Sequence, residues 1–406
     1  MAKVERTATK VLGFSSGEMD FQLMRMLGVC TAGGGAPGEI MDARAKIEGD
    51  DATQWPPAFA NTAAMLVEKA DEALVNGHKV TAREHLLRAS SYFRSAEYFS
   101  DPFGSEVGAH GKASEDAFVK AIEQLPERVV PVQIPFEGKN LPGYLMHPQD
   151  APNRNKTVIV LSGFDGTGEE LYFQTGFDAL KRGYTVLAAQ GPGQVSTLRH
   201  HPDLLFRPDY ETSIAAMIDF ALGREEIDPE RLALYGISFG GYFALRGASH
   251  DSRIKAVIAN SPIIDLGAYM GAFAEGVGDD PEQAAEDVRL DEVDEVPDQY
   301  MPPAVKLSFK SACRRYGVQS FSEWLKALQD YRVDNLGEIR CPALAMVGEA
   351  EGGEAIRQFD EFAKSASGPV TSRRFTQAEG ADMHCQLGNL PLSNAVIYDW
   401  LDGLSA

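Results

Sequence analysis

The stretch RLALYGISFGGYFALR, residues 231–246, predicts a strand, a sharp turn and a helix in direct succession. RLALYGI is an apolar, strand-like run, and GGYFALR favours a helix that follows it at once. Between them, Ser238 has Gly236 two residues before it and Gly240 two residues after it. A crowded strand-to-helix turn needs residues without a Cβ at those two places, so the context favours a serine nucleophile over an idle serine in a glycine-rich loop.

Strand and helix patterns alternate on both sides of this stretch. Strand-like runs of apolar and β-branched residues, separated by helical segments, occur at TVIVLSG (157–163), YTVLAAQ (184–190), KAVIANSP (255–262) and ALAMVGE (343–349). RVVPVQIPF and LPGYLMHP add two strands joined by a turn at 137–140. This order predicts an α/β fold with a mostly parallel, doubly wound sheet and right-handed crossovers.

Two regions depart from the alternation. Residues 1–127 carry helical patterns, in which segments 56–77 and 81–99 predict a helical hairpin, and Thr81 with Glu84 forms a capping-box signature for the second helix. Residues 265–335 are acidic and then amphipathic, which predicts a helical insertion over the sheet. We therefore expect a helical cap domain at 1–127 and a catalytic α/β domain at 128–406.

Bulk composition narrows the classes of partner. The 406-residue chain has a formal net charge of −21, which argues against a nucleic acid or an anionic membrane surface as partner. No run of about 18 apolar residues is present, and the first 20 residues lack the apolar core of a secretory signal, so we expect a cytoplasmic protein. The four cysteines form no C-x-x-C pair and are expected to be free thiols: Cys30, Cys313, Cys341 and Cys385.

A serine nucleophile needs a base and an acid that orients the base. Two histidines follow Ser238. His250 lies at a helix end and is expected on the surface, whereas His384 follows the last predicted strand and is the expected base. The acid should stand at the end of ALAMVG, where Glu349, Glu351 and Glu354 occur, and Asp265 after the preceding strand is a further option.

The oxyanion of a tetrahedral intermediate needs backbone N–H donors placed in advance. One donor is expected from Phe239, directly after the nucleophile, and the second from Phe164 in the loop SGFDGTG (162–168). A phosphate-binding interpretation of that loop fails, because neither G-x-x-x-x-G-K-[ST] nor G-x-G-x-x-G is present.

These residues resemble the α/β-hydrolases that carry an N-terminal helical domain, represented by 2,6-dihydroxypseudooxynicotine hydrolase and the fungal yellowish-green pigment polyketide-shortening hydrolases. The resemblance covers most of the chain and rests on SGFDGTGEE (162–170), AAQGPGQVS (188–196), LYGISFGGYFALR (234–246) and EGADMHCQLGN (379–389). The acidic turn of this family often reads G-x-x-D, which favours Glu351, three residues after Gly348, with Glu349 second. The resemblance implies a helical domain over the active site and, often, a homodimer.

The resemblance also implies a reaction class. It predicts a serine-dependent hydrolase of a small-molecule carbonyl substrate, without a cofactor, that cleaves a carbon–carbon bond beside a ketone in an aromatic or polyketide-like molecule. An ester, lactone or amide would pass through the same machinery and remains the alternative. A non-catalytic binding protein on this scaffold is a further alternative, which the ordered serine, acid and histidine disfavour.

Other residues near these motifs are open to two interpretations. Asp165 and Glu170 would bind a substrate hydroxyl or cap the helix that follows them. Tyr92 and Tyr98 would line a substrate pocket, although core packing of the hairpin is the favoured interpretation. The adjacent His200 and His201 lack the i, i+4 spacing of a helical metal pair, so no metal site is predicted.

Overall fold

The computed structural model describes residues 10–104, 108–274 and 288–404. The chain forms two compact units. Within the described residues, the sheet unit consists of 127–274 and 325–404, and the helical unit consists of 10–104, 108–126 and 288–324.

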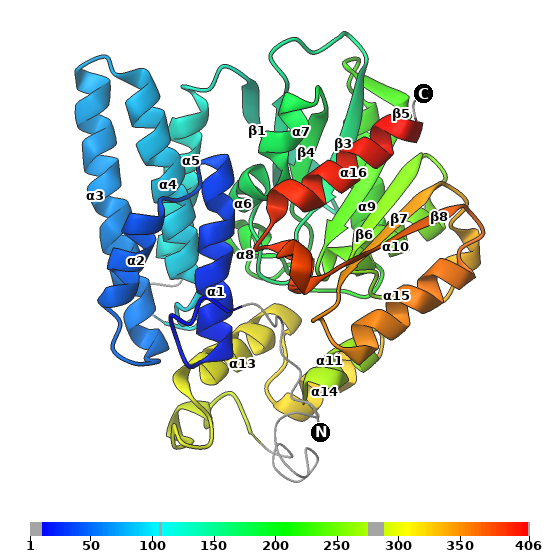
Figure 1. Cartoon of the computed structure of the whole chain (residues 1–406). Helices are drawn as coiled ribbons and strands as arrows, with labels where there is room; N and C mark the ends of the chain where they lie inside the picture. The colour runs from blue at the N-terminus through cyan, green and yellow to red at the C-terminus, as the bar shows by residue number, and fades with distance from the viewer. Residues whose placement is uncertain (1–9, 105–107, 275–287, 405–406) are drawn as a thin grey trace. The chain divides into compact units, whose positions relative to one another are not determined.

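The sheet unit is built on one eight-stranded sheet with the order β1-β2-β4-β3-β5-β6-β7-β8 (Figure 1). β1 and β2 are antiparallel, β2 is antiparallel to β4, and every other neighbouring pair is parallel. The predicted, mostly parallel sheet is therefore confirmed. The strands are β1 (Arg128–Phe136), β2 (Lys139–His147), β3 (Asn155–Leu161), β4 (Thr185–Ala189), β5 (Ile227–Ile237), β6 (Ala256–Asn260), β7 (Ala343–Gly348) and β8 (Val370–Phe375).

β1 and β8 are the outer strands of this sheet. β1 and β2 form the predicted hairpin, whose turn is the two residues Glu137 and Gly138, both with positive φ. A two-residue turn with positive φ matches the right-handed twist of the strands that it joins. The central strands β3, β4 and β6 are buried along almost their whole length, as expected for parallel strands covered on both faces.

Helices cover both faces of the sheet. α16 (Leu390–Leu404) lies across the face seen in Figure 1 and packs on α7 (Phe177–Lys181). Asn394 of α16 donates to Asp178 of α7. α9 (Glu211–Leu222) and α10 (Gly240–His250) pack against each other and against β5. The other helical segments are α6 (Gly168–Leu171), η3 (Tyr172–Gly176), α8 (Val195–His200), α11 (Leu266–Ala274), η5 (Leu336–Glu338), α15 (Gly353–Ser365), η6 (Gln377–Glu379) and η7 (His384–Gln386).

The helical unit confirms the predicted hairpin. α3 (Trp55–Val75) ends where Gly77 takes a φ of 77°, and α4 (Lys79–Tyr98) returns beside it. The capping-box prediction is wrong: α4 begins two residues before Thr81, and His78 occupies the cap position without a side-chain hydrogen bond. The unit also contains α1 (Gly17–Gly28), η1 (Val29–Ala32), α2 (Pro37–Ala45), η2 (Ala52–Gln54), α5 (Ala109–Ile122), η4 (Val293–Glu295) and α13 (Pro303–Tyr316).

The predicted insertion at 265–335 is divided between the units. α11 belongs to the sheet unit, α13 to the helical unit, and α14 (Phe321–Leu328) spans the boundary along the chain. Residues 275–287 of the predicted insertion lie outside the described residues. Lys310 of α13 contacts Asp101 and Asp294 at 2.7 Å each, which ties α13 to the chain after α4. Within the described parts of the chain, no helix is long and apolar enough to cross a membrane.

Candidate active site

Ser238 stands at the turn between β5 and α10 with a φ of 61°. A non-glycine residue rarely adopts this left-handed conformation, and it does so where the surrounding structure enforces it. The Ser238 N–H donates to the carbonyl of Asn260 at the end of β6, at 2.5 Å. A Cβ added to Gly236 would lie 1.8 Å from the carbonyl oxygen of Gly240, so the predicted need for glycine at this turn is met by a real close approach.

Ser238, His384 and Glu351 form one hydrogen-bonded chain. Nε2 of His384 lies 2.8 Å from Oγ of Ser238, and Nδ1 of His384 lies 2.6 Å from Oε2 of Glu351. Burial increases along this chain: Ser238 is half-buried, the His384 side chain is 14% exposed, and that of Glu351 is 0% exposed. Ser238 is thus partly exposed, while the Glu351 carboxylate is enclosed.

The Glu351 carboxylate is held by two further donors. The N–H of Gly348 donates to Oε1 at 2.7 Å, and the hydroxyl of Ser261 donates to Oε2 at 2.5 Å. Glu351 N–H itself bonds to the Gly348 carbonyl, so the turn after β7 folds the longer glutamate side chain back toward the strand end. This turn explains how a glutamate reaches His384 from a place where a shorter aspartate is the commoner acid.

Charges around His384 raise its pKa. Burial of the imidazole lowers the pKa of His384, whereas negative charge on Cys385, which that thiol carries only when ionised, and on the Glu351 carboxylate raises it, and the net shift is upward. Burial also raises the pKa of the Cys385 thiol, which is therefore uncharged at neutral pH. Glu351 is then the charge that stabilises the imidazolium, by direct hydrogen bonding at short distance.

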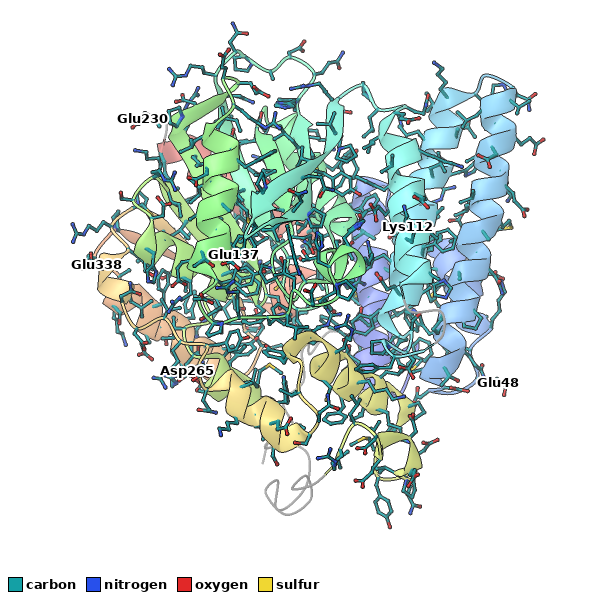
Figure 2. The ribbon with its side chains drawn as sticks, turned by 180° about the vertical axis from the view of Figure 1, so that it is seen from behind. Glu48, Lys112, Glu137, Glu230, Asp265 and Glu338 are labelled. Carbon is teal, nitrogen blue, oxygen red and sulfur yellow. The ribbon has the colours of Figure 1, made fainter. Side chains whose placement is uncertain are left out.

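The other acid and base candidates lie elsewhere. Asp265 pairs with Arg332 at 3.0 Å and caps α11 through the N–H of Ala268, and Figure 2 shows it beside the start of that helix. Glu349 is exposed and accepts from the N–H of Gln377. His250 is exposed at the end of α10, where Nδ1 lies 2.9 Å from the carbonyl oxygen of Arg246.

Glu354 is likewise engaged away from His384, in an ion pair with Arg357 at 2.7 Å. The carboxylates of Asp265, Glu349 and Glu354 are therefore satisfied by partners other than His384. Of the carboxylates that the sequence leaves open, Glu351 is the one that the structure brings to His384.

The loop after β3 passes directly over Ser238. A Cβ added to Gly163 would lie 2.6 Å from Cβ and 2.9 Å from Oγ of Ser238, so the loop backbone approaches the Ser238 side chain closely. Phe164 follows Gly163 on this loop, and its ring stacks on Phe206, which in turn packs on Phe239. The two residues that carry the predicted oxyanion donors therefore share one aromatic neighbour, Phe206.

Asp165 and Glu170 flank the start of α6. The N-cap of α6 is Thr167, whose hydroxyl accepts from the N–H of Glu170, so the expected capping role falls to a third residue. Asp165 is half-buried and Glu170 is buried.

Tyr92 and Tyr98 lie on α4 of the helical unit. Tyr92 is fully buried, packs edge-on against Phe59, and its hydroxyl contacts Glu39 at 2.8 Å and the N–H of Ala36 at 2.9 Å. These contacts agree with the favoured interpretation of Tyr92 as a core residue of the hairpin, because its ring and its hydroxyl both meet protein partners. The Tyr98 hydroxyl donates to Glu18 at 2.5 Å.

No group of three or more metal-binding side chains occurs among the residues that the structure describes. His200 and His201 lie at the end of α8. All four cysteines are unpaired thiols.

Comparison with known proteins gives the same fold throughout. The family model for the alpha/beta hydrolase fold matches residues 156–292. Hydrolase LUC6 of a Fusarium species is 30% identical over 96% of this chain and 97% of its own length. 20-Hydroxy-prefusarin hydrolase FUS2 of Gibberella moniliformis is 35% identical over 62% of each chain. The crystal structure of 2,6-dihydroxy-pseudo-oxynicotine hydrolase superposes with a TM-score of 0.71 at 20% identity, over 92% of this chain and 94% of the other.

Two residues of this site were not identified from the sequence as contributing to it. Ser261 stands at the carboxyl end of β6, where a polar residue after a buried parallel strand is a usable signal. Gln194 lies in the segment AAQGPGQVS, and its side-chain amide bonds to the carbonyls of Ser162 and Gly163 in the loop over Ser238. Its neighbours in the sequence do not indicate these contacts.

Proposed function

Because this chain belongs to the α/β-hydrolase family, we propose that Ser238 is its nucleophile, His384 its general base and Glu351 the acid that orients the base. The continuous contacts from Ser238 Oγ through the His384 ring to Glu351 carry this proposal. A serine hydroxyl becomes nucleophilic when a neutral imidazole takes its proton, and the carboxylate fixes the tautomer that leaves Nε2 free to do so.

The reaction that we propose is hydrolysis of a carbon–carbon bond beside a ketone. Oγ of Ser238 attacks the carbonyl carbon, and its proton passes to Nε2 of His384. The backbone N–H groups of Phe164 and Phe239 stabilise the oxyanion. When the tetrahedral intermediate collapses, the carbon–carbon bond breaks and the imidazolium protonates the leaving carbon. Water, deprotonated by His384, then attacks the acyl carbon. The bond from that carbon to Ser238 Oγ breaks, the imidazolium returns the proton to Oγ, and the acyl group leaves as a carboxylic acid.

The substrate class proposed is an aromatic or polyketide-like ketone whose leaving carbon is acidified by a second carbonyl or an electron-rich ring. A leaving carbanion must be stabilised in this way, because the imidazolium is a weak acid. The relative named as a hydrolase of 20-hydroxy-prefusarin supports a small organic molecule as the substrate. Ester, lactone or amide hydrolysis on the same three residues is the alternative, since a better leaving group needs no other machinery.

A paired assay of the wild type and Ser238→Ala tests the proposal. One substrate set holds aryl and alkyl esters and lactones, the other aryl 1,3-diketones, with products identified by mass. Ser238-dependent cleavage of the diketones, with slow turnover of the esters, is the expected result. Fast ester or lactone turnover with intact diketones would assign the alternative reaction. Turnover of every substrate by Ser238→Ala at the wild-type rate would overturn the nucleophile assignment.

Two further expectations accompany this function. The helical unit is proposed to act as the cap, and the chain is proposed to form a homodimer. Sedimentation of the purified protein tests the second, and a single species at the monomer mass would contradict it.

A further inference from the structure

Gln194 is a fully buried amide in the turn between β4 and α8. Its Nε2 lies 2.6 Å from the carbonyl oxygen of Ser162, 3.0 Å from the Ser162 hydroxyl and 3.1 Å from the carbonyl oxygen of Gly163. Its Oε1 accepts from the N–H of Gly191 at 2.6 Å and lies 3.2 Å from the hydroxyl of Tyr210. Two carbonyls on one side and a backbone N–H on the other fix which end of the amide is nitrogen.

The Gly163 carbonyl and the Phe164 N–H belong to one peptide group. In a trans peptide the carbonyl and the N–H point in opposite directions. Because the Gly163 carbonyl points to Gln194, the Phe164 N–H points away from Gln194. The same loop contacts Ser238 through Gly163, as the 2.6 Å approach of a Gly163 Cβ to Ser238 Cβ demonstrates. The direction of one backbone donor is thus set by a side chain from a different strand end.

A second amide also holds this loop. Gln190 Nε2 donates to the Ser162 hydroxyl at 2.8 Å, and that hydroxyl lies 3.1 Å from the carbonyl of Gly166. Both amides therefore contact the Ser162 hydroxyl, and Gln194 in addition bonds to the carbonyls of Ser162 and Gly163. Loss of Gln194 would free the peptide group that carries the Phe164 donor.

We infer that Gln194 is a positioning residue for the oxyanion hole, which aims the Phe164 N–H at the tetrahedral oxyanion by bonding to the two carbonyls before it. This inference rests on the proposed function, because the oxyanion forms only if Ser238 attacks a carbonyl. Donors placed in advance stabilise the transition state more than the bound substrate. Gln194 therefore acts on kcat and leaves KM nearly unchanged.

Gln194→Glu is the first test variant, because it keeps the shape of the side chain. A carboxylate donates to neither carbonyl, and a protonated carboxyl donates to one. Gln194→Ala is the second variant and removes the amide without adding a charge. Asn155→Asp is the matched control: Asn155 is a buried amide that donates to the Gly183 carbonyl at 2.9 Å, at the opposite end of β3. The Asn155→Asp substitution therefore alters a buried bond of the same strand, β3, and leaves the loop over Ser238 unchanged.

Three quantities are measured for each folded variant: kcat and KM for the ester or diketone that the wild type turns over, the affinity of an aryl trifluoromethyl ketone, and the melting temperature. Ser238 Oγ adds to the carbonyl carbon of this ketone, and the adduct carries an oxyanion like that of the tetrahedral intermediate. We expect Gln194→Glu to lower kcat on the order of 10²-fold, with a parallel loss of ketone affinity and little change in KM. Gln194→Ala should show the same pattern, and Asn155→Asp should keep kcat within about twofold of the wild type.

Several outcomes would overturn the inference. If either folded Gln194 variant keeps wild-type kcat and ketone affinity, or differs from the wild type only in a raised KM, Gln194 does not position the donor. If Asn155→Asp loses kcat equally, the effect comes from general damage to β3. Turnover that Ser238→Ala does not abolish would contradict the proposed function itself. Turnover that depends on Ser238 but is unchanged in the Gln194 variants would contradict this inference alone.

Discussion

The hydroxyl of Ser261 donates to the same carboxylate oxygen of Glu351 that meets Nδ1 of His384, at distances of 2.5 and 2.6 Å. The acid is therefore shared between the proposed base and a serine at the end of the neighbouring strand β6. Each donor withdraws charge from Oε2, so Ser261 tempers the pull of Glu351 on the imidazolium. It also limits the rotation of a side chain that has one more torsion than an aspartate.

Ser261→Ala should lower kcat by about tenfold, because Glu351 loses a donor that orients it. The charge left on Oε2 should raise the pKa of His384 further and move the acid limb of the kcat/KM profile to higher pH. The profile is measured against Ser249→Ala, in which a buried serine loses a bond to the carbonyl of Arg246 in α10. An unshifted acid limb in folded Ser261→Ala would contradict the role given to Ser261.

Glu351→Gln should move the same limb the other way. Glu351 raises the pKa of His384, and the base acts only when neutral, so activity rises as pH passes upward through that pKa. Without the charge the pKa falls and the limb moves to lower pH, while kcat drops by roughly 10²–10⁴-fold because the tautomer is no longer held. Asp265→Ala is the comparison, and an inactive Asp265→Ala beside an active Glu351→Gln would transfer the acid role to Asp265.

Gly163→Ala should impair turnover through the loop over Ser238. Its Cβ would lie 2.6 Å from Ser238 Cβ, so the loop or the serine has to shift, and the oxyanion donor moves with the loop. A displacement of this kind costs on the order of 10²-fold in kcat. Gly38→Ala, where a Cβ meets nothing within 4 Å, is the matched control. Equal activity of the two variants would show that the loop tolerates the extra carbon.

Tyr92→Phe separates packing from substrate contact in the helical unit. The lost hydroxyl bonds to Glu39 and to the N–H of Ala36, so the free energy of unfolding should fall by about 1–3 kcal/mol. Urea unfolding measures this change, and KM should equal that of the wild type. A raised KM with unchanged stability would restore the substrate-binding interpretation of Tyr92.

The chain order of serine, acid and histidine was accessible from sequence because Ser238 and Glu351 follow the apolar strands β5 and β7 within three residues, and His384 lies in the loop between β8 and the last helix. Ser238 and His384 needed only the strand pattern and the order of elements. Which carboxylate reaches His384 depends on how the turn after β7 folds. The residue type does not distinguish the three glutamates in and after that turn, Glu349, Glu351 and Glu354. In the folded turn, the bonds from the Gly348 N–H and the Ser261 hydroxyl hold Glu351 at His384, whereas Glu349 and Glu354 meet Gln377 and Arg357.

The contacts of Ser261 and Gln194 were inaccessible for a related reason. Each side chain bonds to groups more than 30 residues away in the chain, and the pairing exists only once β3, β4, β6 and β7 lie in register. The start of α4 was misplaced because Thr81 and Glu84 carry a cap-like spacing inside the first turns of a helix that begins at Lys79. Local patterns located the elements well, while bonds between strand ends required the folded sheet.

The two outer strands have a consequence for assembly. β1 carries the exposed prolines Pro131 and Pro135, which lack the N–H that another strand would need. β8 presents Arg373 and Arg374, which pair with Glu379 and Asp360. Proline and charge at the rim of a sheet both oppose its continuation into a second molecule. The expected homodimer should accordingly associate through helices or loops, and the chain should resist growth into strand-linked fibres at high concentration.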